Sequence, residues 1–238
     1  MLLRRLSLTA VVLAALIVTP SAFAGSCGLG SYSYAGLGSH TATSGVSATI
    51  TPTAVSAVRD GHVAGWVGVG GVGEGLHGTN AWIQIGLSAF PGDATSRIYY
   101  EIARPGHKPL YREVRKNVNA GETHRFVVQE LEKKPGWWRA WLDGSPVTAP
   151  ISLPGSHAHL TAQALGESWS GSTGGSCNLY SYGFEHVALA SAVDHAWGPV
   201  RRFDLFQDGN YKFTRSSLTS FRAASVASDS RTTASASP

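Results

Sequence analysis

Gln84 is a polar side chain in an apolar setting. It lies between Ile83 and Ile85 in a short run, residues 81–87, that has the composition of a strand. A glutamine at such a place either faces solvent or has a chemical task. A carboxamide can hold a water molecule and donate a hydrogen bond to an oxyanion, and one such donor changes a rate by roughly 10²–10³. A carboxyl group in the same water-poor groove would complete the chemistry, because burial raises its pKa and lets it exchange protons with water and a leaving amine.

Three other segments match the sequence motifs of functional sites but lack the structural context that each motif requires. Residues 68–73 match G-x-G-x-x-G, but the residues that follow cannot open the helix that a dinucleotide requires. Residues 166–170 nearly match the serine nucleophile elbow, yet end in Ser170 and lack a strand-to-helix turn. The pair His157-x-His159 is flanked by Gly and Pro, so we expect an exposed loop and no metal site. The sparse carboxylates also argue against a glycosidase.

The N-terminus has the pattern of a secretory signal peptide over residues 1–24. Arg4 and Arg5 precede an apolar run at 9–18, and the small-residue site Ala-Phe-Ala follows at 22–24. The apolar run is too short to span a bilayer. We therefore expect a secreted, extracellular protein with no membrane segment after signal removal.

Charge excludes one class of partner. Loss of the two signal arginines lowers the formal net charge from +4 to +2, and the remaining Lys and Arg are scattered along the chain. Nucleic-acid binding requires a clustered basic surface, so no nucleic-acid partner is expected.

Two cysteines, Cys27 and Cys177, are present. In an exported chain such a pair suggests one disulfide that closes a very long loop. Neither cysteine belongs to a metal-binding spacing, so the prediction includes no metal. We also expect no other cofactor and a monomeric protein.

Glycine, serine, threonine and valine are abundant and charges are few, which favours many short strands joined by tight turns. The prediction is an all-β, jelly-roll or concanavalin A-like two-sheet β-sandwich, with one domain at 25–223 and a disordered tail at 224–238. Two hairpin turns are expected at Asp143-Gly144 and Asp208-Gly209. The expected strands are 45–51, 65–70, 81–87, 98–102, 111–118, 123–131, 137–142, 146–153, 162–169, 180–192, segments within 204–213, and 216–223.

The order of several short motifs resembles the glutamic peptidases, the eqolisin family of secreted jelly-roll acid endopeptidases. The resemblance covers roughly residues 31–192. The matching segments are YAG at 34–36, VSAT at 46–49, WVGVGG at 66–71, IQIG at 83–86, YE at 100–101, AGE at 120–122 and TAQALGESW at 161–169.

The resemblance implies a function and the residues that perform it. Gln84 takes the place of the family's catalytic glutamine and Glu167 that of its catalytic glutamate. Together they would hydrolyse a polypeptide substrate through a bound water, and Trp66, Trp169 and Glu101 are predicted to contact that substrate. The chain departs from the family at three positions, because Gly70, Ser88 and Gln163 stand where acidic residues are common.

The sequence leaves a second function open, a non-catalytic lectin-like module that binds an extracellular glycan, cell-wall polymer or protein. Its candidate platform is a set of aromatic side chains: Trp137, Trp138, Trp141 and Trp169. A fold does not choose between these functions. The relative placement of Gln84 and Glu167 distinguishes the two functions, because an active pair requires both side chains on one sheet face.

Overall fold

The computed structural model describes residues 27–171 and 177–226, and almost all regular structure in these ranges is β-strand. A short 3-10 helix, η1 (Leu76–Gly78), is the exception there. No helix in the described part of the chain has the length and apolar character needed to cross a membrane. The strands are β1 (Tyr32–Pro52), β2 (His62–Gly71), β3 (Ala81–Ala89), β4 (Ser96–Ala103), β5 (Leu110–Val118), β6 (His124–Leu131), β7 (Lys134–Leu142), β8 (Ser145–Pro146), β9 (Ile151–Ser152), β10 (Thr161–Trp169), β11 (Ser181–Ser191), β12 (Trp197–Pro199), β13 (Phe203–Gln207), β14 (Tyr211–Arg215) and β15 (Phe221–Ser225).

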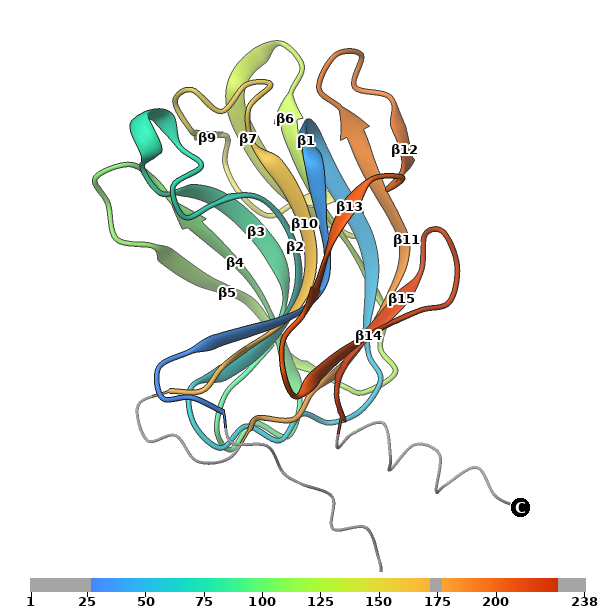
Figure 1. Cartoon of the computed structure of the whole chain (residues 1–238). Coiled ribbons are helices and arrows are strands. Elements are labelled where there is room, and N and C mark those ends of the chain that lie inside the picture. The colour runs from blue at the N-terminus through green and yellow to red at the C-terminus, as the bar shows by residue number, and fades with distance from the viewer. Residues whose placement is uncertain (1–26, 172–176, 227–238) are drawn as a thin grey trace, which may run out of the picture.

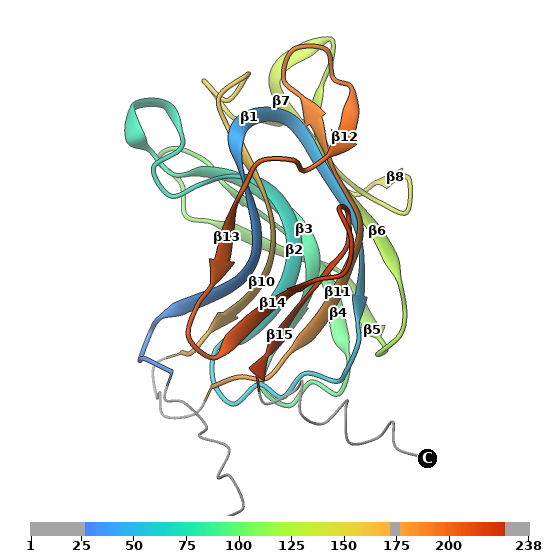
Figure 2. The same ribbon diagram turned by 45° about the vertical axis from the view of Figure 1, so that its right-hand side comes forward.

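The strands form two sheets that pack face to face (Figures 1 and 2). Sheet A has the order β13-β1-β10-β2-β3-β4-β5, and sheet B has the order β14-β15-β11-β1-β6-β7, all antiparallel. Strand β1 belongs to both sheets, and Figure 2 shows it in blue, arching from one to the other. The predicted all-β, jelly-roll type of two-sheet sandwich is confirmed.

The alternation of side chains along β2 explains how sheet A can have two apolar faces. Val63, Val67 and Val69 point into the core between the sheets. Ala64 and Trp66 point to the opposite face, where they form a second, smaller apolar cluster. Successive strand residues face opposite sides, so this one strand supports both the core and the outer face on which the candidate site lies.

Two sequence predictions about the strands are wrong. The single strand expected at 146–153 is instead the two short strands β8 and β9, because Pro146 and Pro150 cannot donate to a continuous ladder. The turn at Asp208-Gly209 does not close a hairpin, since β13 pairs with β1 in sheet A and β14 pairs with β15 in sheet B. The Asp208 carboxylate accepts a hydrogen bond from the backbone N–H of Tyr34 and so holds this turn at β1.

The expected signal peptide, 1–24, lies outside the described residues, and most of the expected tail, 224–238, does too. Strand β15 continues to Ser225, two residues past the expected domain end. Ser225 is buried, and its N–H donates to the carbonyl of Tyr180, which explains why the strand extends this far.

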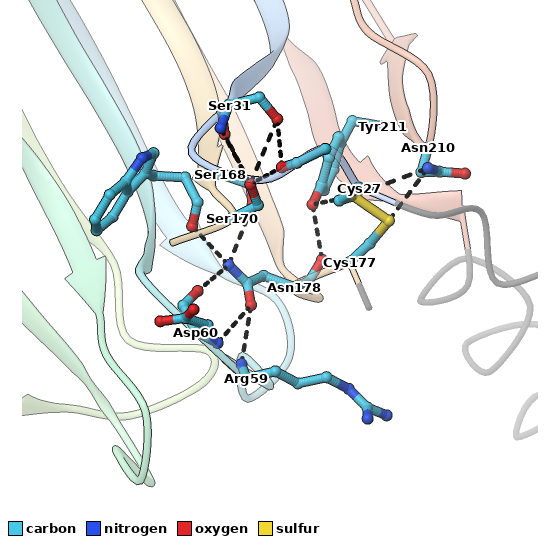
Figure 3. Close-up of a disulfide and its surroundings, with 12 residues drawn as sticks. Cys27, Ser31, Arg59, Asp60, Ser168, Ser170, Cys177, Asn178, Asn210 and Tyr211 are labelled. Atoms are coloured by element: carbon cyan, nitrogen blue, oxygen red, sulfur yellow. Dashed lines mark hydrogen bonds between the residues drawn. A yellow bond between two sulfur atoms is a disulfide. The ribbon is translucent and has the colours of Figure 1, made fainter. Parts of the chain in front are cut away.

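The disulfide predicted between Cys27 and Cys177 is present (Figure 3). The side chain of the next residue, Asn178, contacts three backbone groups in two segments: its Oδ1 accepts from the N–H of Arg59, and its Nδ2 donates to the carbonyl oxygens of Asp60 and Trp169. The disulfide and Asn178 thus anchor the N-terminal end of the described chain beside the end of β10.

Replacing both Cys27 and Cys177 by Ser is expected to lower the free energy of unfolding by about 2–5 kcal/mol. The bridge joins residues 150 positions apart, so its removal frees a very long loop in the unfolded chain. Urea unfolding of the oxidised protein and of the double variant measures the difference. Reduced wild-type protein is the control and should match the variant; equal midpoints for all three would contradict the prediction.

Candidate active site

The register of four central strands of sheet A brings the predicted site residues onto one face. Glu167 in β10 lies opposite Ala64 in β2, Trp66 lies opposite Gly86 in β3, and Gln84 lies opposite both Gly68 and Glu101. Directly opposed residues of antiparallel strands point to the same face. Every second residue of a strand faces the same side, so Ala64, Trp66 and Gly68 of β2 share one face. Glu167, Gln84 and Glu101 share it too, because each lies opposite one of these residues or opposite another of the three. This is the face of sheet A that is turned away from the core.

A cavity of about 260 Å³ opens on this face. Gln84, Glu101 and Glu167 line it together, although they come from three different strands. Two other predicted residues, Trp66 and Trp169, do not line it. The complete lining is His62, Ala64, Gln84, Ser88, Phe90, Tyr99, Glu101, Tyr111 and Glu167.

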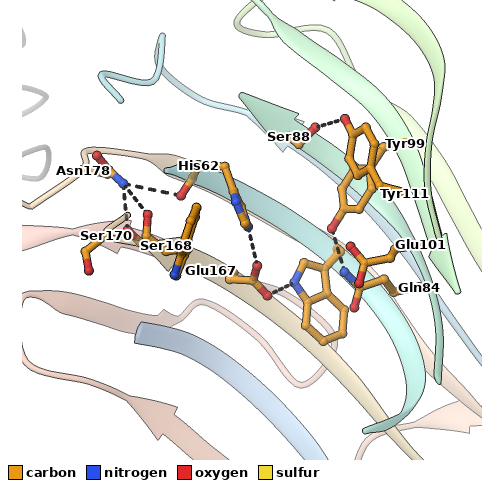
Figure 4. Close-up of polar contacts among 12 residues, drawn as sticks. His62, Gln84, Ser88, Tyr99, Glu101, Tyr111, Glu167, Ser168, Ser170 and Asn178 are labelled. Atoms are coloured by element: carbon orange, nitrogen blue, oxygen red, sulfur yellow. Dashed lines mark hydrogen bonds and ion pairs between the residues drawn. The ribbon is translucent and has the colours of Figure 1, made fainter. Parts of the chain in front are cut away.

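Both oxygens of Glu167 accept a hydrogen bond from a side chain of β2 (Figure 4). Nε2 of His62 lies 3.0 Å from Oε1, and Nε1 of Trp66 donates to Oε2 at 3.0 Å. The residue is only 6% exposed. A carboxylate oxygen has more than one lone pair, so this fixed group can still accept a bond from a water in the cavity.

Trp66, predicted to contact substrate, is not among the residues that line the cavity. Its ring is buried in the apolar cluster on the same face of sheet A, and its N–H donates to Glu167. It thus orients the carboxylate and does not form a wall of the cavity. Trp169 is placed beside the cavity in a group of rings, with its centroid 5.7 Å from that of His62 and 6.4 Å from that of Tyr32.

A hydrogen bond to Tyr99 and the close approach of Gly68 in β2 fix the position of Gln84. Its Nε2 donates to the Tyr99 hydroxyl at 3.0 Å, and the side chain is 9% exposed. Gly68 faces it across the β2–β3 ladder, where a Cβ atom would lie 2.7 Å from the Cβ of Gln84. No real Cβ contact is that short, so the glycine is what allows Gln84 to occupy its position.

Glu101 is a second carboxyl group in the cavity. Its Oε1 accepts a hydrogen bond from Nε1 of Trp82 at 3.1 Å. Burial raises the pKa of Glu101, and the nearby negative charge of Glu167 raises it further, against opposing effects of Trp82 and His62. The cavity therefore holds two interacting carboxyl groups.

Tyrosine side chains lie near the two carboxyl groups of the site. Burial, and then the charge of Glu167, raise the pKa of Tyr34 and of Tyr99. Both groups thus stay protonated over the whole range in which carboxyl groups titrate. Tyr99 also stacks on Tyr111, with ring centroids 5.1 Å apart, and the Tyr111 hydroxyl lies 3.0 Å from Ser88 Oγ.

Two of the three positions that depart from the glutamic-peptidase pattern, Gly70 and Ser88, lie near the candidate site. Gly70 has a φ of +78°, and a Cβ atom at this place would overlap with the carbonyl oxygen of Ala81, so an aspartate does not fit this backbone. Ser88 lies at the cavity, where it is paired with Tyr111 and not with a carboxylate. The acidic groups of this cavity are thus Glu101 and Glu167, among the residues that line it.

Sequence reasoning missed His62, Tyr99, Tyr111 and Phe90 as parts of the site. His62 and Tyr99 could have been found from alternation, because His62 is four residues before Trp66 and Tyr99 is two before Glu101. Tyr111 and Phe90 carry no such signal, since their places depend on strand order and on a turn. Within residues 27–171 and 177–226, no three His, Cys, Asp or Glu side chains are grouped so that they could hold a metal ion.

Fold and site together define a β-sandwich with a carboxyl- and amide-lined cavity on the outer face of one sheet. The sequence matches no protein-family model and no curated protein. Among solved structures, the chain is similar to scytalido-glutamic peptidase in complex with a peptide-based transition-state analogue and with a transition-state analogue inhibitor, each with a TM-score of 0.57 and 15% identity. It is also similar to SCP-B, a member of the eqolisin family of peptidases in a complex with the tripeptide Ala-Ile-His, with a TM-score of 0.56 and 16% identity. In all three comparisons the match covers 81% of this chain and 98% of the other. The TM-scores show that the fold is shared, and at identities this low the similarity concerns the fold alone.

Proposed function

We propose that this protein is a secreted endopeptidase of the glutamic type that hydrolyses polypeptides with Glu167 and Gln84. The observation that carries the proposal is the cavity itself, which Glu167 from β10 and Gln84 from β3 line together. The similarity of the fold to glutamic peptidases supports it. Export after removal of residues 1–24 and a monomeric state belong to the same proposal.

In the proposed reaction, Glu167 accepts a proton from a cavity water, and the water oxygen forms a bond to the carbonyl carbon of the scissile peptide. His62 and Trp66 keep the carboxylate in place during this step. Gln84 donates through Nε2 to the oxyanion that forms, and Tyr99 orients its amide. The C–N bond then breaks, and the leaving nitrogen receives a proton.

Cleavage of casein and of a mixed peptide library between pH 2 and pH 7 tests the proposal. The variants are Glu167→Gln and Gln84→Ala, and the control is Glu185→Gln, an exposed carboxyl on β11 of sheet B. The proposal requires cleavage by the wild type and the control and its loss in both site variants. Cleavage that neither site variant affects would refute it.

The glycan-binding alternative has less support. Trp138 is 0% exposed and donates to Ser156 inside the core, so it cannot contact a ligand. Trp137 and Trp141 lie with it on β7 in sheet B, outside the cavity lining. If the wild type cleaves no peptide, glycan-array binding that is lost in Trp169→Ala would favour this alternative.

The variant Trp66→Phe is expected to lower kcat by roughly 10- to 100-fold with little change in KM, the typical size for one hydrogen bond to a charged group. The ring still fills the apolar cluster, but Oε2 of Glu167 loses its donor. Steady-state kinetics on a cleaved peptide measures the change, with Trp137→Phe on sheet B as the control. Unchanged kcat in Trp66→Phe would mean that the N–H is not needed.

A further inference from the structure

Glu101 is a cavity-lining carboxyl group that the steps above do not use. It faces Gln84 across the β3–β4 ladder and shares the cavity with Glu167. Its side chain is fixed by the hydrogen bond from Trp82. A half-buried carboxyl group that shares a cavity with a proposed catalytic base needs an explanation, because it adds electrostatic repulsion to the site.

The two carboxyl groups have different surroundings. Glu167 receives hydrogen bonds from two side chains, one on each oxygen, which suits a group that accepts a proton. Glu101 receives one, from Trp82, and burial together with the charge of Glu167 raises the pKa of Glu101. Pairs of carboxyl groups in unlike environments often divide acid and base roles between them.

We propose that Glu101 is the general acid of the reaction and donates the proton that the leaving amine receives. The inference rests on the proposed peptidase function. Glu167 takes one proton from the attacking water as the C–O bond forms. Glu101 gives its proton to the amide nitrogen as the C–N bond breaks, so the products are a carboxylic acid and an amine. Exchange with solvent then returns a proton to Glu101 and removes one from Glu167.

The assignment of the acid role to Glu101 and of the base role to Glu167 predicts how the rate of peptide cleavage depends on pH. An acid acts only while protonated, so the rate of peptide cleavage falls as the pH rises through the raised pKa of Glu101. Titratable side chains of five strands surround the group: Tyr32 and Tyr34 of β1, His62 of β2, Tyr99 of β4, Tyr111 of β5 and Glu167 of β10. The pKa values of the four tyrosines are raised, so these groups stay protonated in this range, and the charges that act on Glu101 are those of Glu167 and His62.

The test compares Glu101→Gln with wild type on two substrates, a cleaved peptide and the matching phenyl ester. Phenoxide can leave without being protonated, whereas an amine leaves only when its nitrogen receives a proton. We expect Glu101→Gln to lower kcat/KM by roughly 10²-fold on the peptide and by less than about 10-fold on the ester. The variant should also lose the alkaline fall of the peptide profile, while Glu167→Gln loses activity on both substrates.

Equal loss on both substrates, or no loss on the peptide, would overturn the assignment of Glu101 while leaving Glu167 and the peptidase proposal intact. Failure of wild type to cleave any peptide would overturn both. If Glu101→Gln does not fold, the wild-type profiles decide: an alkaline fall that is present for the peptide and absent for the ester supports the acid role, and identical profiles refute it.

Discussion

Glu167→Gln is expected to reduce peptide cleavage by roughly 10⁴-fold, the upper end of what one proton-transferring group contributes. The amide cannot take a proton from the attacking water, so the first bond-forming step loses its base. Both kcat and kcat/KM should fall, because the group acts in the transition state and not in substrate binding.

The loss should not come from misfolding. A glutamine at this place can turn its Oε1 to the Trp66 N–H and its amide group to Nε2 of His62, which accepts in one neutral tautomer. Thermal unfolding of the variant, followed by circular dichroism, checks this point. Glu185→Gln on sheet B controls for loss of a carboxyl group as such. A Glu167→Gln variant that folds and cleaves within about 10-fold of wild type would exclude Glu167 as the base.

Gln84→Ala is expected to lower kcat by roughly 10²- to 10³-fold, as removal of one oxyanion donor does elsewhere. The donor acts on a charge that exists only after attack, so KM should change little. Gln129→Ala, on β6 of sheet B, is the matched control. A large rise in KM with unchanged kcat would show that Gln84 binds substrate without stabilising the oxyanion.

The partner of Gln84 offers a second measurement. Tyr99→Phe removes the hydroxyl that Nε2 of Gln84 contacts but leaves the ring stacked on Tyr111. If Tyr99 orients the amide, this variant lowers kcat in the same direction as Gln84→Ala but by less, and the double variant is no worse than Gln84→Ala alone. Additive losses would mean that the two side chains act separately.

Local pattern alone was enough for the fold class. Alternation in β2 separates Val63 and Val67 from Trp66, and glycine-rich or proline-containing turns separate the strands. These signals depend on the pleat, in which neighbouring side chains face opposite sides. They also single out Gln84, because an amide between two isoleucines is unusual in any strand that is buried on both faces. The disulfide followed from the presence of two cysteines in a chain predicted to be exported.

Strand neighbours and register were decided only in the tertiary structure. Alternation tells which residues of one strand share a face, but it does not tell which strand lies beside it. The contact of His62 with Glu167, the place of Glu101 opposite Gln84, and the crossing of the chain at Asp208 from sheet A to sheet B all depend on pairings between distant segments. Sequence thus determined a sandwich with a candidate amide and carboxyl. Long-range strand pairing gave that carboxyl its two donors and placed a second carboxyl in the same cavity.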